Sequence, residues 1–338
     1  MLAELTRKVV CGDALSRAEA QSALGALFEE TTSDVVIACF LTALSVKGET
    51  AREIAGFAQT MREYAVKFDA PRADLVDTAG TGGGVASFNV STTAAFVIAG
   101  SGIGVAKHGN RAATSRSGSA DMLEALGVRI DAPLETVQRC FDRNGLAFLF
   151  APAFHPAMKR VVGIRRQIPH RTIFNLLGPL TNPAGAPFQV VGVFDPELAE
   201  RLARALHMLG TKRSWVVHSL DGLDEISVQA PTRIVEVTPD AIREFELDPA
   251  DYGFRYQGEA PPAIKGGDPD ANARLCLEIL DGQRRDVLKD LVVMNSAAAI
   301  HLAADVSLSE ALQRAELSIS SGSAYRKLRE LIETSRES

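Results

Sequence analysis

The pattern of apolar and polar residues changes near residue 68. Before that point apolar residues recur with helical spacing, and the segments Ser16–Glu19 and Thr50–Glu53 have the spacing of helix-capping boxes. The segment 35–44 between them is apolar on nearly every side. A helix of this kind lies at the centre of a domain or at a subunit interface. The first 68 residues are therefore predicted to form a small helical domain.

After residue 68, short β-type runs alternate with helical stretches, and from about Asp268 the pattern is helical again. Strands are predicted at Leu75–Thr78, Gly102–Lys107, Phe188–Phe194 and Ser214–His218, and helices from Ser91, at Ala120–Leu126 and from Asp195 to Gly210. This alternation favours a mostly parallel sheet with helices on both faces. The predicted fold class is α/β. Residues 1–68, joined by helices from about 160–187, form the helical domain, and residues 69–338 form the larger α/β domain.

Composition and charge limit the class of protein. The chain has 338 residues, of which 46% are hydrophobic, and 36 basic against 42 acidic side chains give a net charge of −6. Bulk disorder is excluded because disordered chains are poor in apolar residues. A broad electrostatic surface for nucleic acid is not expected, since such a surface needs a basic domain or stripe. A local positive pocket for a small anionic ligand remains compatible with this charge.

The spacing of the cysteines and the length of the apolar segments indicate in which cellular compartment the protein is expected. The four cysteines lie far apart and form no C-x-x-C pair, so we expect buried free thiols rather than a thiolate metal site or a disulfide scaffold. Residues 1–13 carry charges where a signal peptide needs an apolar run. The most apolar stretch, Thr93–Ala106, is too short to span a membrane. We therefore expect a cytoplasmic protein with no membrane partner.

Two glycine-containing stretches have the composition of phosphate-binding loops. In the first, Asp77–Thr92, a strand leads into a glycine run and then into a helix that begins with hydroxyl side chains. Glycines let the backbone approach a phosphate closely, and free N–H groups at a helix start point toward it. The second, Lys107–Asp121, carries three positive charges, an asparagine and several hydroxyls after a strand. A tight turn and a solvated loop are the alternatives.

Two further stretches carry charged groups. Asp224 and Glu225 follow a predicted strand and could bind Mg²⁺, which prefers one or two carboxylates plus substrate phosphates. Adjacent acids in a loop are otherwise usually solvated. The segment 154–183 contains His155, Arg165 and the run R-T-I-F-N-L-L-G-P-L-T-N-P. An arginine beside an apolar pocket can hold a carboxylate in a bidentate fork, and a basic helix face is the alternative.

These four stretches, in this order, resemble the anthranilate phosphoribosyltransferase family. The shared patterns are G-T-G-G followed by N-x-S-T, then K-H-G-N-R with S-G-S-A-D, H-P-A-M-K, R-T-I-F-N-L-L-G-P-L-x-N-P and G-L-D-E. The resemblance extends from the N-terminal helices to at least Asn295. One departure lies in the glycine loop, where Gly84 and Val85 follow Gly83 and the aspartate of the family pattern G-T-G-G-D-G is missing.

The resemblance implies a nucleoside-phosphorylase-like transferase fold, a homodimer joined through the helical domains, and three groups of site residues. The residues implied to bind phosphoribosyl pyrophosphate (PRPP) are Gly80, Gly83, Gly84, Ser87, Asn89, Ser91, Thr92, Lys107, Ser115 and Ser119. Those implied to face anthranilate are Gly80, Asn110, His155 and Arg165. Ser91, Asp224 and Glu225 would bind magnesium, with two ions expected, and Lys107, Asp224 and Glu225 would be catalytic.

The implied reaction is transfer of 5-phosphoribose to the amino group of anthranilate with release of pyrophosphate, the second step of tryptophan biosynthesis from chorismate. Two alternatives remain. A pyrimidine-nucleoside-phosphorylase-like enzyme would share the fold and the glycine loop, but would use inorganic phosphate and would not need Asp224 and Glu225 for metal. A nucleic-acid-binding relative without activity would need a basic surface, which the net charge of −6 disfavours.

Overall fold

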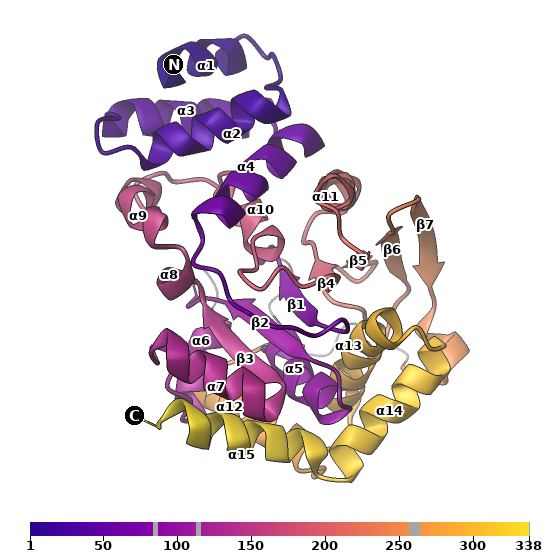
Figure 1. The fold of residues 1–338 in the computed structure, drawn as a ribbon. Coiled ribbons are helices and arrows are strands. Elements are labelled where there is room, and N and C mark those ends of the chain that lie inside the picture. The colour runs from indigo at the N-terminus through magenta and orange to yellow at the C-terminus, as the bar shows by residue number, and fades with distance from the viewer. Residues whose placement is uncertain (84–86, 113–115, 257–263, 338) are drawn as a thin grey trace.

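The N-terminal residues form a helical bundle in the computed structural model, which describes residues 1–83, 87–112, 116–256 and 264–337. The bundle lies at one end of the molecule (Figure 1). Both predicted capping boxes are present, Ser16 with Glu19 and Thr50 with Glu53, at the starts of the second and fourth helices. The helices are α1 (Leu2–Val10), α2 (Arg17–Phe28), α3 (Asp34–Lys47) and α4 (Ala51–Tyr64).

The rest of the chain is built around a seven-stranded sheet with the order β3-β2-β1-β4-β5-β6-β7. The pairs among β1 to β5 are parallel, and β6 and β7 are added as antiparallel strands at one edge. The predicted mostly parallel sheet is confirmed. The strands are β1 (Val76–Gly80), β2 (Val105–Gly109), β3 (Leu146–Phe150), β4 (Phe188–Gly192), β5 (Arg213–Ser219), β6 (Thr232–Val237) and β7 (Ile242–Leu247).

Helices cover both faces of this sheet (Figure 1). Neighbouring strand residues such as Val190 and Val191 belong to different buried clusters, because successive side chains of a strand point to opposite faces. One cluster includes α5 and α13, and the other includes α11 and the bundle. The helices are α5 (Val90–Gly100), α6 (Ser119–Ala125), α7 (Leu134–Asn144), α8 (Ala151–Phe154), α9 (Lys159–Arg165), α10 (Phe174–Leu177), α11 (Pro196–Met208), α12 (Pro269–Leu280), α13 (Val287–Ala304), α14 (Leu308–Ser320) and α15 (Ser323–Ser335), with short 3-10 turns at Pro156–Met158, Gly178–Leu180 and Pro249–Tyr252.

The strand order positions a binding site. The chain runs from β1 outward to β2 and β3, and then crosses to the other side of β1 to form β4. In open parallel sheets, ligands bind outside the carboxyl ends of the strands where the order reverses in this way. Gly80 at the end of β1 and Gly192 at the end of β4 are directly paired across this point. The loops that follow β1, β2 and β5 therefore meet at one edge of the sheet.

Two sequence expectations differ from the structure. Cys140 and Cys276 are buried, but Cys11 and Cys39 are exposed, so the expectation of four buried thiols is wrong for half of them. Cys11 follows the end of α1 and Cys39 lies on the outer side of α3. Strands β3, β6 and β7 were not predicted, and in β7 five of the six residues are exposed.

Helix α13 is the one described helix that is long and apolar enough to cross a membrane, judged by length and composition. However, 67% of it is buried inside the protein, where it contacts α5, α14 and β4. A helix that is apolar on all sides and enclosed in this way is a core helix.

Candidate active site

The glycine loop follows β1 and leads to α5. Gly82 and Gly83 have φ values of +64° and +94°, a region that side chains with a Cβ rarely adopt. The side chain of Asn89 does not cap α5, and the backbone of Ser91 in its first turn hydrogen-bonds to the carboxyl of Glu225, so the start of this helix already faces an acidic group. Asn89, just before α5, is fixed by hydrogen bonds with Ser117 and by Asn272, whose Nδ2 donates to Asn89 Oδ1 at 2.8 Å.

Lys107 on β2 projects toward the same loop. Its side chain is buried, and its Nζ donates to the carbonyl oxygen of Thr78 at 2.7 Å and to Ser91 Oγ at 3.3 Å. Burial lowers the pKa of Lys107, whereas the negative charges of Asp77 and Glu225 act in the opposite direction. The ammonium group is therefore held between the end of β1 and the start of α5, next to two carboxylates.

Asp224 and Glu225 lie in the loop after β5, against the ends of β1 and β4. A Cβ added to Gly192 would lie 1.7 Å from the carbonyl oxygen of Asp224, and one added to Gly80 would lie 3.3 Å from Asp224 Oδ2. The two glycines thus let the acidic loop approach the sheet closely. Burial, together with the neighbouring Asp224 charge, raises the pKa of Glu225 to about 8, although Lys107 opposes the shift.

The Asp224 carboxyl has different neighbours from that of Glu225. Burial raises its pKa, and a backbone hydrogen bond and the electrostatic effects of His218 and Arg171 oppose this. Glu225 is instead influenced by Lys107 and the backbone of Ser91. The carboxyl groups of these two adjacent residues therefore interact with different charged groups of the site.

A buried acid that sequence reasoning did not assign supports this arrangement. Asp77 on β1 accepts hydrogen bonds from Asn182 Nδ2 at 2.7 Å and from the backbone N–H of His108 at 3.3 Å. Burial raises its pKa to about 6, and the charge of Lys107 opposes the shift. An acidic residue within the apolar run Leu75–Thr78 was the available signal for its special position.

The loop after β2 is closed upon itself near the start of α6. Ser119 Oγ donates to the carbonyl oxygen of Asn110 at 3.2 Å, and Asn110 Oδ1 accepts from the backbone N–H of Arg111. A Cβ on Gly118 would lie 2.3 Å from the backbone nitrogen of Ala112, so the loop needs glycine there. The structure therefore places Asn110 and Ser119 side by side, beyond the end of the strand that carries Lys107.

A more apolar group of side chains lies next to Lys107 on the side of the helical bundle. The rings of His108 and His155 are 5.1 Å apart, and His108 Nδ1 lies 3.1 Å from the carbonyl oxygen of Gly178. Burial lowers the pKa of His108 to about 3 and that of His155 to about 4, so both rings are neutral at physiological pH. Both ring nitrogens of His155 are buried with no hydrogen-bond partner among the described residues.

Arg165 ends α9 in the segment that packs on the bundle. Its guanidinium carbon lies 5.7 Å from the centre of the Phe174 ring, and burial lowers its pKa. No carboxylate pairs with it within the described parts of the chain. A half-buried guanidinium beside an aromatic ring can hold a planar carboxylate.

The structure thus gathers most of the predicted site residues at one edge of the sheet. Gly80, Gly83, Ser87, Asn89, Ser91 and Thr92 lie on the glycine loop and the start of α5. Gly84 and Ser115 lie outside the described residues, so their predicted roles are not placed. Arg171 has no role in the sequence prediction beyond its place in the run R-T-I-F-N-L-L-G-P-L-T-N-P, yet its guanidinium Nη1 donates to the carbonyl oxygen of Gly82 at 3.3 Å.

The donor set suits a hard divalent cation. Carboxylate and hydroxyl oxygens of Asp224, Glu225 and Ser91 are ligands that Mg²⁺ accepts, and a cation beside Glu225 would offset the burial that raises its pKa. Among the described residues no group of three or more His, Cys, Asp and Glu side chains could hold a metal. Magnesium at this edge therefore needs further oxygen ligands from a bound substrate.

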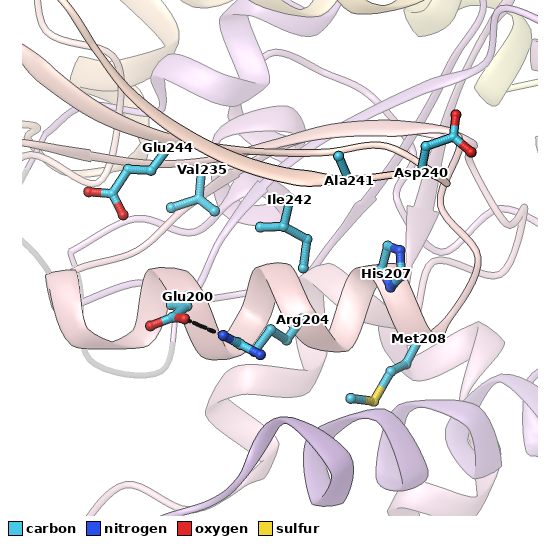
Figure 2. Close-up of a pocket in the computed structure, with 9 residues that line it drawn as sticks. All are labelled: Glu200, Arg204, His207, Met208, Val235, Asp240, Ala241, Ile242 and Glu244. Atoms are coloured by element: carbon cyan, nitrogen blue, oxygen red, sulfur yellow. Dashed lines mark hydrogen bonds and ion pairs between the residues drawn. The ribbon is translucent and has the colours of Figure 1, made fainter.

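A pocket of about 460 Å³ lies elsewhere, between α11 and strands β6 and β7 (Figure 2). Its charged side chains include the ion pair of Arg204 with Glu200 at 2.7 Å, together with Glu244 and Asp240. None of the predicted site residues lines it, and the two glycine-containing loops lie at the carboxyl ends of β1 and β2 instead. It is therefore not the candidate active site.

Comparison with known proteins agrees with both parts of this architecture. Residues 3–65 match the glycosyl transferase family, helical bundle domain, and residues 72–325 match the glycosyl transferase family, a/b domain. The chain is 47% identical over 338 residues to an anthranilate phosphoribosyltransferase of Rubrobacter xylanophilus, covering 99% of this chain and 98% of the relative. The chain belongs to the anthranilate phosphoribosyltransferase family.

Solved structures of this family have the same fold. The anthranilate phosphoribosyltransferase of Thermus thermophilus superposes with a TM-score of 0.91 at 42% identity, with 100% of both chains covered. That of Saccharomyces cerevisiae, in complex with PRPP and Mg, superposes with a TM-score of 0.88 at 31% identity, covering 99% of this chain and 97% of the yeast chain. The predicted family, fold class and transferase activity are confirmed. Identity over the whole length also decides against the phosphorylase and the nucleic-acid-binding alternatives.

Proposed function

We propose that Lys107, Asp224 and Glu225 carry out the transfer of 5-phosphoribose from PRPP to the amino group of anthranilate, in tryptophan biosynthesis. The main support for this assignment is that these three residues lie together at the carboxyl ends of β1, β2 and β5, beside a glycine loop. His108 and His155 connect this edge to the segment that carries Arg165. In this proposal, the Lys107 ammonium group for the pyrophosphate and the Arg165 guanidinium group for a planar aromatic acid therefore belong to neighbouring parts of one site.

In this proposal the glycine loop and the start of α5 bind PRPP through backbone N–H groups and hydroxyls. The residues assigned to PRPP are Gly80, Gly83, Gly84, Ser87, Asn89, Ser91, Thr92, Lys107, Ser115 and Ser119. Lys107 faces the leaving pyrophosphate, because its ammonium group already lies against Ser91. The missing loop aspartate leaves the backbone donors of the glycines in place.

We assign Ser91, Asp224 and Glu225 as magnesium ligands, with two ions bound. Two adjacent carboxylates and a hydroxyl support this assignment, because Mg²⁺ is usually bound by one or two carboxylates together with phosphate oxygens of the substrate. Bound magnesium neutralises charge on the pyrophosphate, and the yeast relative was solved with both PRPP and Mg. Counting bound Mn²⁺ in the presence of PRPP tests the number, with two per chain expected and one contradicting the assignment.

Anthranilate is assigned to the side of the bundle. Arg165 holds its carboxylate in a bidentate fork, while Gly80, Asn110 and His155 face the ring and the amine. Because the imidazole of His155 is neutral, it places no second positive charge beside the amine. The yeast relative has also been solved with 4-fluoroanthranilate.

Positioning and charge neutralisation suffice for the chemistry. The free amine forms the N–C bond at the anomeric carbon, the C–O bond to pyrophosphate breaks, and pyrophosphate takes the electron pair. The proton of the amine passes to solvent. The anomeric carbon passes through an oxocarbenium-like transition state, as in other glycosyl transfers. Lys107 stabilises the developing negative charge on the pyrophosphate. No strong general base is needed, because the aromatic amine is weakly basic and attacks in its neutral form.

The domain division and assembly are part of the same proposal. Residues 1–68 with about 160–187 form one domain and residues 69–338 the other; Val161 and Phe174 share a buried cluster with the bundle, which supports this division. We further propose a homodimer through the bundle, because α3 exposes 70% of Val35 and 83% of Val46 on one face. A charged Val46→Asp variant should be monomeric by light scattering, and an unchanged dimer contradicts this interface.

A cytoplasmic location is also proposed. All four cysteines are free, and two of them are exposed, as is usual in a reducing compartment. Cell fractionation with antibody detection tests the location, and recovery of the protein outside the cytoplasmic fraction would contradict it.

Loss of anthranilate fluorescence on addition of PRPP, with and without magnesium, tests the proposed function. Magnesium-dependent loss is expected. A folded protein that leaves the fluorescence unchanged under both conditions would overturn the assignment.

A further inference from the structure

Arg171 joins the helical bundle to the glycine loop. It lies in the connection between α9 and α10, and its carbonyl oxygen accepts a hydrogen bond from Ser45 Oγ of α3 at 2.8 Å. The main chain of Arg171 is thereby tied to the bundle. Its side chain extends the other way, to the edge of the sheet.

The guanidinium group lies against an aromatic ring. Its central carbon lies 3.7 Å from the centre of the Phe194 ring, just after β4, which is the distance of direct stacking. From this position Nη1 donates to the carbonyl oxygen of Gly82 at 3.3 Å. Stacking on a ring fixes the orientation of an arginine, so the donor direction toward the loop is set as well.

Gly83 provides the space for this side chain. A Cβ added to Gly83 would lie 1.4 Å from Arg171 Nη2 and 2.4 Å from its Cζ. Gly83 also has a φ of +94°. The loop conformation and the arginine position are therefore coupled: a side chain at Gly83 on this backbone path would displace the guanidinium group, which in the structure lies against the loop backbone.

Arg171 also faces the acidic loop on the other side of the site. Its positive charge acts on the carboxyl of Asp224, which we assign to magnesium. The residue thus lies between the glycine loop, the carboxylate edge and the bundle that carries the anthranilate side.

We propose that Arg171 is a positioning residue for PRPP, which sets the path of the backbone at Gly82 and Gly83 and links it to the helical bundle. This inference rests on the proposed function, because it assumes that the glycine loop binds the pyrophosphate. It assigns Arg171 to the phosphoribosyl donor, in contrast to Arg165, which we assign to anthranilate.

Calorimetric titration of PRPP with magnesium into Arg171→Ala, Arg171→Lys and the wild-type protein tests the inference. Arg171→Ala should weaken PRPP binding about 10-fold or more, and Arg171→Lys should weaken it nearly as much because a lysine keeps the charge but loses the planar stack. The KM for anthranilate should change less than about 2-fold, which separates positioning of the donor from a general structural defect.

The exposed neighbour Arg166 provides a matched control, since Arg166→Ala removes a positive charge from the same segment. It should leave both affinities unchanged. Wild-type-like PRPP binding by Arg171→Ala, or equal changes in the KM values of both substrates, would overturn the inference. A wild-type protein that does not bind PRPP would instead overturn the proposed function itself.

A second measurement uses Gly83→Ala alone and combined with Arg171→Ala. In the wild-type background the added Cβ meets both the guanidinium group and an unfavourable φ, so PRPP binding should weaken strongly. In the Arg171→Ala background only the backbone strain remains, and the further loss should be at least about 3-fold smaller. Strictly additive effects would contradict the mutual dependence of the two residues.

Discussion

The buried charges of the active site can be compared with a partly buried cluster of charge at the amino end of β5. In the second cluster Arg213 Nε donates to Glu236 Oε1 at 2.8 Å, and Trp215 Nε1 donates to the same oxygen at 3.1 Å. Arg213 also contacts His301 Nε2 at 3.0 Å. Although burial alone would raise the pKa of Glu236, the hydrogen bonds from Trp215 and Arg213 lower it.

The active-site cluster contains the same types of charge, but its hydrogen bonds and opposite charges offset the effect of burial only in part. Burial raises the pKa of Glu225 to about 8 and that of Asp77 to about 6, and it lowers the pKa of Lys107. In the structural cluster, the protein itself supplies the hydrogen bonds and opposite charges that offset burial. In the active-site cluster, we expect a bound metal ion and a phosphorylated substrate to supply the remaining opposite charges. Such poorly compensated groups are common at functional sites.

The largest expected effect comes from removing the charges of the acidic loop. Asp224→Asn with Glu225→Gln should lower kcat/KM by about 10³-fold or more, since metal-assisted neutralisation of a leaving group contributes several kcal/mol. The folded state should be retained, because both changes relieve buried charge. Steady-state kinetics and circular dichroism check this. Unchanged magnesium dependence of turnover would contradict the metal assignment.

Arg165→Ala should have the next largest effect, confined to one substrate. Loss of a bidentate contact to a carboxylate should raise the KM for anthranilate by about 10- to 100-fold and leave the KM for PRPP within about 2-fold. Measuring each KM at saturating concentration of the other substrate checks this. Equal increases in both values would mean that Arg165 does not hold the anthranilate carboxylate.

The structural cluster should show the opposite behaviour. Arg213→Ala leaves the partly buried Glu236 with fewer partners and should lower the free energy of unfolding by about 2 kcal/mol, while kcat stays within about 2-fold. Urea unfolding and steady-state kinetics check the two parts. A large loss of turnover with unchanged stability would break the distinction between the two clusters.

The last prediction concerns stability and leaves turnover aside: in the absence of magnesium, stability should depend on pH. The pKa of Glu225 is raised from 4.5 to about 8 in the folded protein, so its contribution to stability is full below pH 4.5 and is lost as the pH rises through 8. Glu225→Gln should therefore flatten the fall in Tm between pH 5 and pH 8. Parallel Tm profiles of the variant and the wild-type protein would contradict the buried position of this carboxyl.

Much of the fold and of the site could be predicted from sequence because the signals are local. The capping boxes marked the starts of α2 and α4, and Asp195 with Pro196 marked the start of α11. The motifs around Lys107 and Asp224 follow strands, and parallel strands bring their carboxyl ends to one edge. Their meeting in space therefore followed from the predicted strand alternation.

The remaining features depend on contacts between distant segments. Arg171 contacts Gly82 from 89 positions away in the sequence, and no local pattern indicates that Gly83 must leave room for its guanidinium group. Asn272 contacts Asn89 from 183 positions away. Strand β7 forms because β6 offers backbone partners, although its own side chains are mostly exposed. Such features become visible only when the chain is folded.

The central claim is that PRPP and magnesium complete the charge cluster of Lys107, Asp224 and Glu225. Calorimetric titration of PRPP into the wild-type protein and into Asp224→Asn with Glu225→Gln, each with and without magnesium, tests it most directly. We predict that magnesium strengthens PRPP binding to the wild-type protein at least about 10-fold and has little effect on binding to the variant. Equal strengthening of both proteins by magnesium would contradict the account.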